Sequence, residues 1–419
     1  MTFKSLGLIS PLLKSVQQQG YNSPSPIQLK TIPIIIEGHD VLASAQTGTG
    51  KTAAFTLPML QNLNQFSKKG HRSIKALVLT PTRELADQVY SNIKVYSEFL
   101  DFKTTVIYGG VNQKPQVKKL RAGIDILVST PGRLIDLEGQ RHLSLSKVEI
   151  FVLDEADRML DMGFKRDIDK IISLIPLKRQ NLMFSATFSK EIKKLAHVIL
   201  KYPKLINASP ENSMVEAIKQ KVFRVSKEKK TKLLIKLISD GNWKQVLIFT
   251  RTKHGANKLC EKLVNAEISS LAIHGNKSQS ARKKALFSFK KNEIRVLVAT
   301  DIAARGLDIP LLPNVVNFEL PNVPQDYIHR IGRTGRAGAN GVAISLVCAE
   351  ETSYLLSIEQ LINKKFEKEI IKGFEPDLNA STEPPKIGGN RQNRRFRSKN
   401  NKGHSKKKSG KPFKNKFRF

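Results

Sequence analysis

The sequence predicts an α/β protein made of two doubly wound parallel-sheet domains. Short, nearly continuous apolar runs alternate with segments of helical period along the chain, as in parallel sheets covered on both faces. At 419 residues, the chain is longer than one ordinary core requires. A polar stretch, NASPENSMVE, interrupts the pattern near the middle. We therefore expect a first domain at 1–206, a flexible linker at 207–216, a second domain at 217–372 and a basic disordered tail at 373–419.

The expected strands are short and are bounded by turn residues. In the first half they are Asp40–Ala45, Ala76–Thr80, Thr105–Tyr108, Ile124–Ser129, Ile150–Leu153 and Leu182–Ser185. In the second half they are Val246–Thr250, Ser270–His274, Val296–Thr300, Val315–Leu320 and Val342–Val347. Most of the motifs described below begin where one of these strands ends. Because ligands bind at the carboxyl ends of strands in open α/β sheets, the motifs should lie together.

The charge of the chain indicates a polyanionic partner. The net charge is +35, and the segment Lys386–Phe419 contains 14 Lys or Arg residues and no acidic residue. The first 385 residues therefore still carry +21. Nucleic acid is the expected partner, and an anionic membrane surface is the alternative.

Cysteine use and hydropathy favour a cytoplasmic protein. Cys260 and Cys348 are far apart and lack metal-ligand spacing, which indicates two buried thiols in a reducing compartment. The apolar stretch Leu6–Leu13 is interrupted by Ser10 and Pro11 and does not resemble a signal peptide. No run approaches 18 apolar residues, so we expect no membrane partner.

The segment Ala45–Thr52 (AQTGTGKT) has the features of a phosphate-binding loop. It follows an expected strand, and Gly48 and Gly50 allow its N–H groups to turn inward beside a helix N-terminus. Lys51 would contact the β- and γ-phosphates, and Thr52 would help to hold Mg²⁺. Ala45 stands where the pattern G-x-x-x-x-G-K-[ST] has its first glycine, and an ordinary Gly-Thr turn is the alternative interpretation.

The tetrapeptide DEAD, Asp154–Asp157, follows the apolar residues FVL at a strand end. Asp154 is placed to hold Mg²⁺, and Glu155 can accept a proton from an attacking water. The alternative is an acidic helix start, since carboxylates favour helix N-termini. The phosphate loop upstream favours the catalytic interpretation.

The segment His329–Arg336 (HRIGRTGR) places arginines at intervals of three between glycines. Guanidinium groups in this pattern suit a triphosphate. Because they belong to the second domain, Arg333 and Arg336 would reach the γ-phosphate only when the domains close, as arginine fingers supplied in cis. Contact with an RNA backbone alone is the alternative.

Three further motifs accompany these: PTREL (Pro81–Leu85), TPGR (Thr130–Arg133) and SAT (Ser185–Thr187). The whole set occurs in the order found in DEAD-box ATP-dependent RNA helicases of superfamily 2. The chain resembles that family over residues 1–370. DEADRMLDMGF and LPNVPQDYIHRIGRTGRAG are most similar to the bacterial RhlE-like subgroup. The resemblance implies two RecA-like domains, ATP and Mg²⁺ as cofactors, and an RNA-stimulated ATPase.

The resemblance also implies roles for single residues on the ATP side. Gln28, in the Q-motif-like GYNSPSPIQ, would read the adenine edge, and Phe3 would stack on the base. Asp308 would meet the ribose beside Gly306. Ser185, Thr187, His329 and Arg330 would couple hydrolysis to strand separation. The full nucleotide-binding set is Phe3, Gln28, Ala45, Gln46, Thr47, Gly48, Thr49, Gly50, Lys51, Thr52, Gly306 and Asp308.

The RNA-facing residues implied by the resemblance come from both domains. They would contact phosphates and 2′-hydroxyls, and such contacts fix position but carry little sequence information. We therefore expect low sequence specificity. The set is Pro81, Thr82, Arg83, Gly109, Gly110, Thr130, Arg133, Arg251, Gln279, Arg282 and Thr300.

The expected function is an ATP-dependent RNA helicase that separates or remodels RNA duplexes and RNA–protein complexes. Two alternatives are an RNA annealing or binding protein with a vestigial nucleotide site, and a DNA-directed superfamily 2 motor. We expect a monomer, with ribosomal precursors or RNA-decay complexes as candidate targets. In the tail, Phe396, Phe413, Phe417 and Phe419 interleave with basic residues, which suits RNA tethering; a solubilising end is the alternative.

Overall fold

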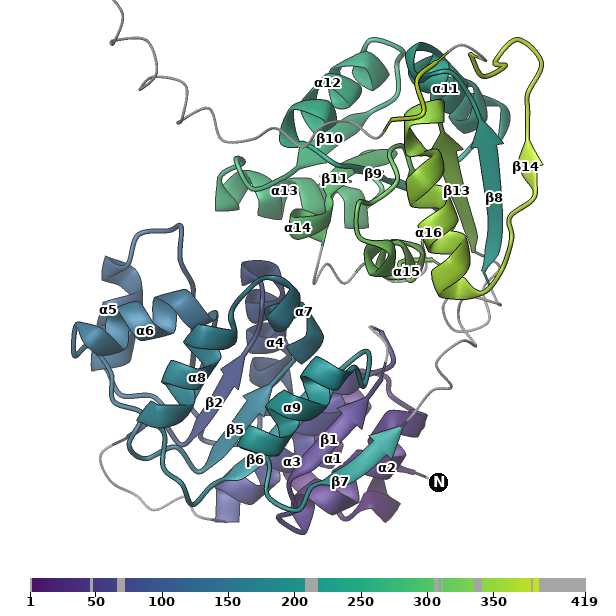
Figure 1. Ribbon diagram of the computed structural model, residues 1–419. Helices are drawn as coiled ribbons and strands as arrows, with labels where there is room; N and C mark the ends of the chain where they lie inside the picture. The colour runs from purple at the N-terminus through teal and green to yellow at the C-terminus, as the bar shows by residue number, and fades with distance from the viewer. Residues whose placement is uncertain are drawn as a thin grey trace, which may run out of the picture.

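A computed structural model of the chain shows two lobes (Figure 1). The structure describes residues 2–45, 48–65, 72–207, 218–304, 309, 312–334, 341–377 and 380–383. The predicted linker, apart from Asn207, lies outside these residues, as does nearly all of the basic tail. Within the described part of the chain, no helix is long and apolar enough to cross a membrane.

Lobe 1 contains a seven-stranded sheet in the order β3-β4-β2-β5-β6-β1-β7, and all of its strand pairs are parallel. Neighbouring strands pair across long stretches of sequence, so each connection crosses over the sheet. The strands are β1 Val41–Ser44, β2 Ala76–Leu79, β3 Thr104–Ile107, β4 Ile126–Ser129, β5 Ile150–Leu153, β6 Gln180–Ser185 and β7 Lys204–Asn207.

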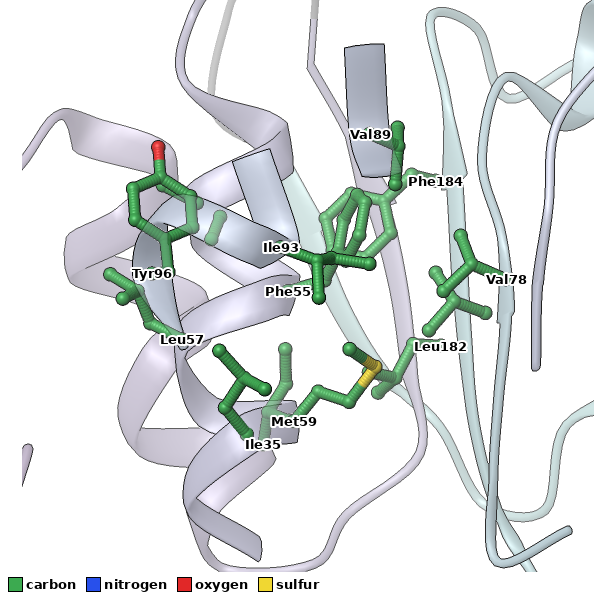
Figure 2. Close-up of a cluster of buried hydrophobic side chains, with 14 of the residues drawn as sticks. Ile35, Phe55, Leu57, Met59, Val78, Val89, Ile93, Tyr96, Leu182 and Phe184 are labelled. Carbon is green, nitrogen blue, oxygen red and sulfur yellow. The ribbon is translucent and has the colours of Figure 1, made fainter. Parts of the chain in front are cut away.

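Helices cover both faces of this sheet. Side chains alternate between the faces, so Val41 and Ala43 enter one hydrophobic cluster and Leu42 enters the other. Helices α1–α4 pack on the first face, where the rings of Phe55 and Phe184 lie 5.3 Å apart (Figure 2). Helices α5–α9 pack on the second face. The helical segments are η1 Phe3–Leu6, α1 Ser10–Gln18, α2 Pro26–Ile36, α3 Lys51–Gln65, α4 Arg83–Tyr96, α5 Lys114–Arg121, α6 Pro131–Gly139, α7 Ala156–Asp161, α8 Lys165–Leu174 and α9 Lys190–Ile199.

Lobe 2 contains a second parallel seven-stranded sheet, in the order β10-β11-β9-β12-β13-β8-β14. Its strands are β8 Lys219–Arg224, β9 Val246–Thr250, β10 Ser270–Ile273, β11 Val296–Thr300, β12 Asn314–Asn317, β13 Val342–Val347 and β14 Lys368–Glu369. Its helical segments are η2 Lys227–Lys229, α11 Lys230–Asp240, α12 Lys253–Val264, α13 Gln279–Lys290, α14 Asp301–Ala304, α15 Pro324–Ile331, η3 Ala349–Glu351 and α16 Thr352–Ile362.

The fold class predicted from the sequence is confirmed. Each of the eleven expected strands is present, with its ends shifted by at most three residues. The sequence prediction missed β7, β8 and β14. These strands occupy one end of each sheet and contain the lysine-rich segments KLIN, KQKVFR and KE, so they lack the apolar run that marks a strand buried on both faces.

The two lobes meet through polar side chains. Each hydrophobic cluster found among the described residues belongs wholly to one lobe. Among the described residues, five pairs bridge the lobes with charged or hydrogen-bonding groups: Arg158–Asp326, Glu84–Gln279, Glu84–Arg282, Asp87–Lys283 and Tyr108–Lys283. The lobes are therefore joined by contacts that water can replace when they separate.

Candidate nucleotide and RNA site

The strands that precede the ATP-side motifs are neighbours in the sheet of lobe 1. In the order β5-β6-β1, they end at DEAD, SAT and the phosphate loop. The Ala45 N–H donates to the Ser185 carbonyl at 3.1 Å, and the Ser44 hydroxyl donates to the Ala186 carbonyl at 3.2 Å. The fold therefore brings together segments that are more than a hundred residues apart in sequence.

The phosphate loop requires glycine at two positions. Gly48 and Gly50 have φ values of 82° and 91°, which L side chains rarely adopt. A Cβ at Gly50 would also lie 2.4 Å from Gln28 Nε2. Lys51 is the first residue of α3 and its side chain is buried at the loop. Gln46 and Thr47, the two loop residues between Ala45 and Gly48, lie outside the described part of the chain.

The segment Ser25–Gln28 holds this loop in place through hydrogen bonds. The Ser25 hydroxyl donates to the Thr49 carbonyl at 2.7 Å, and Gln28 Nε2 donates to the Gly50 carbonyl at 3.1 Å. Gln28 Oε1 accepts from the Ser25 N–H at 2.9 Å, which completes a capping box at the start of α2. The amide predicted to read adenine is thus held against the loop. Phe3 is only 6% exposed and lies in the core cluster of lobe 1.

The DEAD segment forms a buried acidic turn. Asp154 is 2% exposed, and burial raises its pKa to about 7, although the Lys51 ammonium group opposes the shift and Glu155 adds to it. Asp154 Oδ1 accepts from the Glu155 N–H at 2.9 Å. Glu155 itself adopts a left-handed conformation, with φ of 52°, immediately before α7. Backbone strain of this kind is uncommon for a residue other than glycine and often marks a functional position.

The last residue of DEAD links this turn to SAT. Asp157 Oδ2 accepts from the Ala186 N–H at 3.1 Å, and Asp157 Oδ1 accepts from the Arg158 N–H at 3.0 Å. Ser185 Oγ accepts from the Thr187 N–H at 3.3 Å. A hydrogen bond therefore links the acidic turn directly to the backbone of SAT, so movement of one should displace the other.

Arg330, to which the resemblance gives a coupling role, is held by groups of its own lobe. Its guanidinium binds both Asp301 carboxylate oxygens, at 2.6 and 2.7 Å, and donates to the Glu319 carbonyl at 2.6 Å. It is 1% exposed because it lies in the last turn of α15, which packs on the sheet. Arg333 follows the helix and lines a small cavity with Arg158, Asp301, Asp326, His329 and Arg330. Gly306, Asp308 and Arg336 lie outside the described residues.

The RNA-side residues of lobe 1 follow the adjacent strands β3, β4 and β2. Thr82 caps α4 by accepting from the Leu85 N–H at 3.3 Å, and Pro81 is buried beside it. The Arg83 guanidinium lies so close to Gly110 that a Cβ there would be 2.0 Å from it. The loop of Gly109 and Gly110 thus fits against Arg83.

A second arginine of lobe 1 has unused hydrogen-bonding capacity. Arg133 Nη2 donates to the Val111 carbonyl at 3.2 Å, and its Nε lies 3.4 Å from Asp136. Its Nη1 is buried and has no hydrogen-bond partner among the described residues. Thr130 stands at the N-cap of the same helix, α6. A buried donor without a partner is uncommon and is consistent with a ligand oxygen at this position.

The RNA-side residues of lobe 2 lie at the ends of β9 and β11 and at the start of α13. Arg251 Nη2 lies 3.7 Å from Glu319 and 3.8 Å from Glu351, and Thr300 ends β11. Gln279 and Arg282 face lobe 1, where both bind Glu84 at 2.9 Å. These two residues therefore bridge the lobes in this structure.

Sequence reasoning missed the residues that join the lobes. Glu84, Asp87, Arg158, Lys283 and Asp326 are polar residues within expected helices, and a solvated helix face would have the same composition. Lys283 Nζ lies 2.7 Å from Asp87 and 3.3 Å from the Tyr108 hydroxyl. The only signal in the sequence was their position within or next to motifs. Among the described residues, no cluster of three or more His, Cys, Asp or Glu side chains could hold a metal by itself.

Comparison with known proteins gives a consistent result. The DEAD/DEAH box helicase model matches residues 25–195, and the helicase conserved C-terminal domain model matches residues 229–338. The chain is 42% identical over 366 residues to the DEAD-box ATP-dependent RNA helicase RhpA of Helicobacter pylori. This match covers 87% of this chain and 73% of that protein. It is 40% identical over 368 residues to the DEAD-box ATP-dependent RNA helicase CshA of Bacillus subtilis, covering 88% and 74%.

The solved structure of S. cerevisiae Dbp5 bound to RNA and ADP BeF3 is similar over both lobes. The TM-score is 0.78 at 32% identity, and the match covers 88% of this chain and 95% of Dbp5. Because the match extends over both lobes, it includes their relative arrangement as well as the fold of each. The relatives described here bear other names than RhlE, so that finer assignment stays a prediction.

Proposed function

The chain belongs to the DEAD-box ATP-dependent RNA helicases, and we propose that it uses ATP bound between its lobes to open or remodel RNA locally. Enzymes of this family are RNA-stimulated ATPases. The observation that carries the proposal is the convergence of the phosphate loop, the buried acidic turn and the SAT segment at adjacent strand ends, facing a second lobe that supplies arginines. This arrangement suits phosphoryl transfer, in which positioning and charge stabilisation supply most of the catalysis.

The nucleotide site suits ATP with Mg²⁺. Lys51 and the loop N–H groups would bind the phosphates, while Thr52 and Asp154 supply hard oxygen donors of the kind that Mg²⁺ prefers. The raised pKa of the buried Asp154 supports this assignment, because a cation beside the carboxylate would offset the energy of burying its charge. Mg²⁺ bound there would neutralise charge that develops on the phosphates. Since Mg²⁺ is usually bound by one or two carboxylates together with substrate phosphates, these two side chains suffice.

Hydrolysis would depend on groups from both lobes. Glu155 would accept the proton of the attacking water, and the strained backbone at this residue fixes where its carboxylate can point. Arg333 and Arg336 would stabilise negative charge on the γ-phosphate once the lobes close. Gln28, Phe3, Gly306 and Asp308 are proposed contacts to the adenosine. His329, with Ser185 and Thr187, would transmit the state of the nucleotide to the RNA side.

RNA would lie across both lobes at the ends of β3, β4 and β2 in lobe 1 and of β11 and β9 in lobe 2. Arg83, Arg133 and Arg251 would bind phosphates, and the loop of Gly109 and Gly110 would admit a phosphate close to the backbone. Because each ligand spans the two lobes, ATP and RNA should each favour closure and so bind cooperatively. An ATP dissociation constant that saturating RNA leaves unchanged would contradict this coupling.

Four finer proposals rest on composition and family. The enzyme would act as a monomer in the cytoplasm, with ribosomal precursors or RNA-decay complexes as candidate targets. The tail Lys386–Phe419 would tether RNA through phosphate contacts and stacking. Its deletion should weaken RNA binding and flatten the salt dependence while leaving the RNA-independent ATPase unchanged. An unchanged salt slope would rule out the tether.

The deciding experiment is steady-state ATPase with and without single-stranded RNA, comparing wild type with Glu155→Gln. We expect strong stimulation by RNA and a loss of at least about 100-fold in the variant, because general-base catalysis contributes that much. Glu98→Gln, at an exposed position of the same lobe, is the matched control and should behave as wild type. Equal stimulation by matched DNA would favour a DNA-directed motor, and RNA binding without any hydrolysis would favour an annealing protein.

A further inference from the structure

The helix that carries the acidic turn and the helix that leads into Arg333 are joined by one buried ion pair. Arg158 lies in α7, directly after DEAD, and Asp326 lies in the first turn of α15. Arg158 Nη1 is 3.1 Å from Asp326 Oδ1. The two side chains are 4% and 12% exposed, so both charges are largely removed from water when the lobes meet.

The described surroundings make Arg158 dependent on this partner. Among the described residues of its own lobe, the guanidinium has one weak ion pair, from Nη1 to Asp161 at 3.4 Å. Its Nη2 is buried and has no hydrogen-bond partner in the part of the chain that the structure describes. Closure therefore buries the Arg158 charge, and Asp326 is its short-range partner among the described residues. If Asp326 were removed, the buried charge would oppose the closed state.

The pair is also connected to both halves of the catalytic machinery. The Arg158 N–H donates to Asp157, whose other oxygen accepts from the Ala186 N–H of SAT. On the other side, Asp326 begins the helix whose last turn holds His329 and Arg330, and Arg333 follows one residue after its C-cap. Arg158, Asp326, His329 and Arg333 line the same small cavity. The ion pair thus sets the distance between the acidic turn and the proposed arginine finger.

We propose that Arg158 and Asp326 are a positioning pair that makes closure of the lobes conditional on correct alignment of α7 and α15, and so brings Arg333 to the nucleotide. This inference rests on the proposed function and deepens it. Neither residue touches substrate. Their effect is on the equilibrium between open and closed lobes, and through it on the coupling between ATP and RNA.

The test is a double-mutant cycle with Arg158→Met, Asp326→Asn and the double variant, measured by RNA-stimulated ATPase. Each single change should raise the RNA concentration for half-maximal stimulation by about 10-fold or more, and should reduce the effect of RNA on ATP affinity. ATP affinity without RNA should stay at the wild-type value, because the nucleotide loop of lobe 1 is untouched. The double variant should be less impaired than the product of the single effects, since the interaction between two paired residues can be lost only once.

A second readout does not require activity. Small-angle scattering should show that the wild type contracts when single-stranded RNA and a non-hydrolysable ATP analogue are added, and that each single variant needs more RNA to contract. Lys165→Met is the control, because its ion pair with Asp169 is exposed and lies within one helix of lobe 1. Thermal unfolding identifies any variant that fails to fold.

The outcomes separate this inference from the proposed function. If the wild type contracts with both ligands but lacks RNA-stimulated ATPase, the proposed function is wrong. The contraction of the variants then still tests whether Arg158 and Asp326 act as a pair. If both single variants contract and couple as wild type does, the inference is wrong. Strictly multiplicative effects in the cycle would also overturn it, because two residues that act independently do not form a pair.

Discussion

The two lobes have the same order of strands but use corresponding positions differently. The sixth strand is β1 in lobe 1 and β8 in lobe 2, and each leads to a helix whose first residue is a lysine, Lys51 or Lys230. In lobe 1 a glycine-rich loop precedes that lysine. In lobe 2 the residues between β8 and Lys230 (VSKEK) contain no glycine. The same sheet therefore supports a phosphate loop in only one lobe.

Two buried carboxylates, which follow different strands of the two sheets, also differ in their partners. No Lys or Arg of the described chain forms an ion pair with Asp154, which follows the fourth strand of lobe 1 and keeps a raised pKa. In lobe 2, Glu351 follows the fifth strand and is paired with Lys230 in a fully buried ion pair. Its Oε1 also accepts from the Leu320 N–H at 3.0 Å. Lobe 2 thus pairs this buried carboxylate with a lysine of its own, whereas Asp154 has no ion-pair partner among the described residues.

Replacing the carboxylate of lobe 1 should give the largest effect on activity. Asp154→Asn removes the charge proposed to hold Mg²⁺, so RNA-stimulated ATPase should fall by about 100-fold or more. The stability of the ligand-free protein should not fall, because burial opposes the charged carboxylate more than Lys51 favours it, as the raised pKa shows. Steady-state ATPase and thermal unfolding of the same preparation check both parts. A lower melting temperature would show that Asp154 is a structural residue like Glu351.

Replacing the carboxylate of lobe 2 should give the opposite result. Glu351→Gln leaves Lys230 buried without its partner, and we expect the free energy of unfolding to fall by about 3–5 kcal/mol. Denaturant unfolding measures this loss. Lys236→Met breaks an exposed pair with Asp240 in the same helix as Lys230 and should change stability by less than about 1 kcal/mol. Equal effects of the two substitutions would remove the distinction between the lobes.

The helix caps offer a smaller and more symmetrical test. Thr82 in lobe 1 and Thr252 in lobe 2 follow corresponding strands, and each accepts from a backbone N–H at the start of a helix. Alanine at either position should lower stability by about 1 kcal/mol. Only Thr82→Ala should also weaken RNA binding, which filter binding can measure. Serine keeps the hydroxyl and should restore stability at both positions.

The smallest effect concerns the pH dependence of lobe 2. Burial lowers the pKa of His274, and the like charges of Lys277, Lys253, Arg282 and His254 lower it further. The unfolded chain then binds a proton more readily than the folded chain, so stability should fall as the pH drops below about 6.5. His274→Asn should flatten the melting temperature between about pH 5 and 7. An unchanged slope would mean that other groups control this range.

The fold was predictable because its strands are buried on both faces. The sequence of such a strand is a short apolar run, independent of the neighbouring sequence. Ile150–Leu153 and Val296–Thr300 are examples, and their predicted bounds agree with the structure. Strands at the β7 and β14 ends of the sheets did not carry this signal. The phosphate loop and DEAD were predictable for a related reason, since each is one contiguous segment with its own backbone requirements.

The contacts between the lobes could not be predicted in the same way. Arg158 and Asp326 are 168 positions apart, and Glu84 and Gln279 are 195 apart. Each is polar and lies in a helix, so the local pattern predicts only a solvated face. The sequence also did not show that Arg330 is held inside lobe 2. Its spacing matches Arg333 and Arg336, but it lies in the last turn of α15, where its guanidinium binds Asp301.

The absence of a shared apolar cluster between the described parts of the two lobes has a thermodynamic consequence. Exposure of apolar surface to water raises the heat capacity of a protein, and exposure of polar surface lowers it by a smaller amount per unit area. Separation of lobes that meet through Arg158, Glu84, Lys283 and their partners exposes mostly polar groups. The opening step should therefore lack the large positive heat-capacity change of unfolding. The logarithm of its equilibrium constant should then vary almost linearly with reciprocal temperature, without the curvature that a large heat-capacity change gives to unfolding.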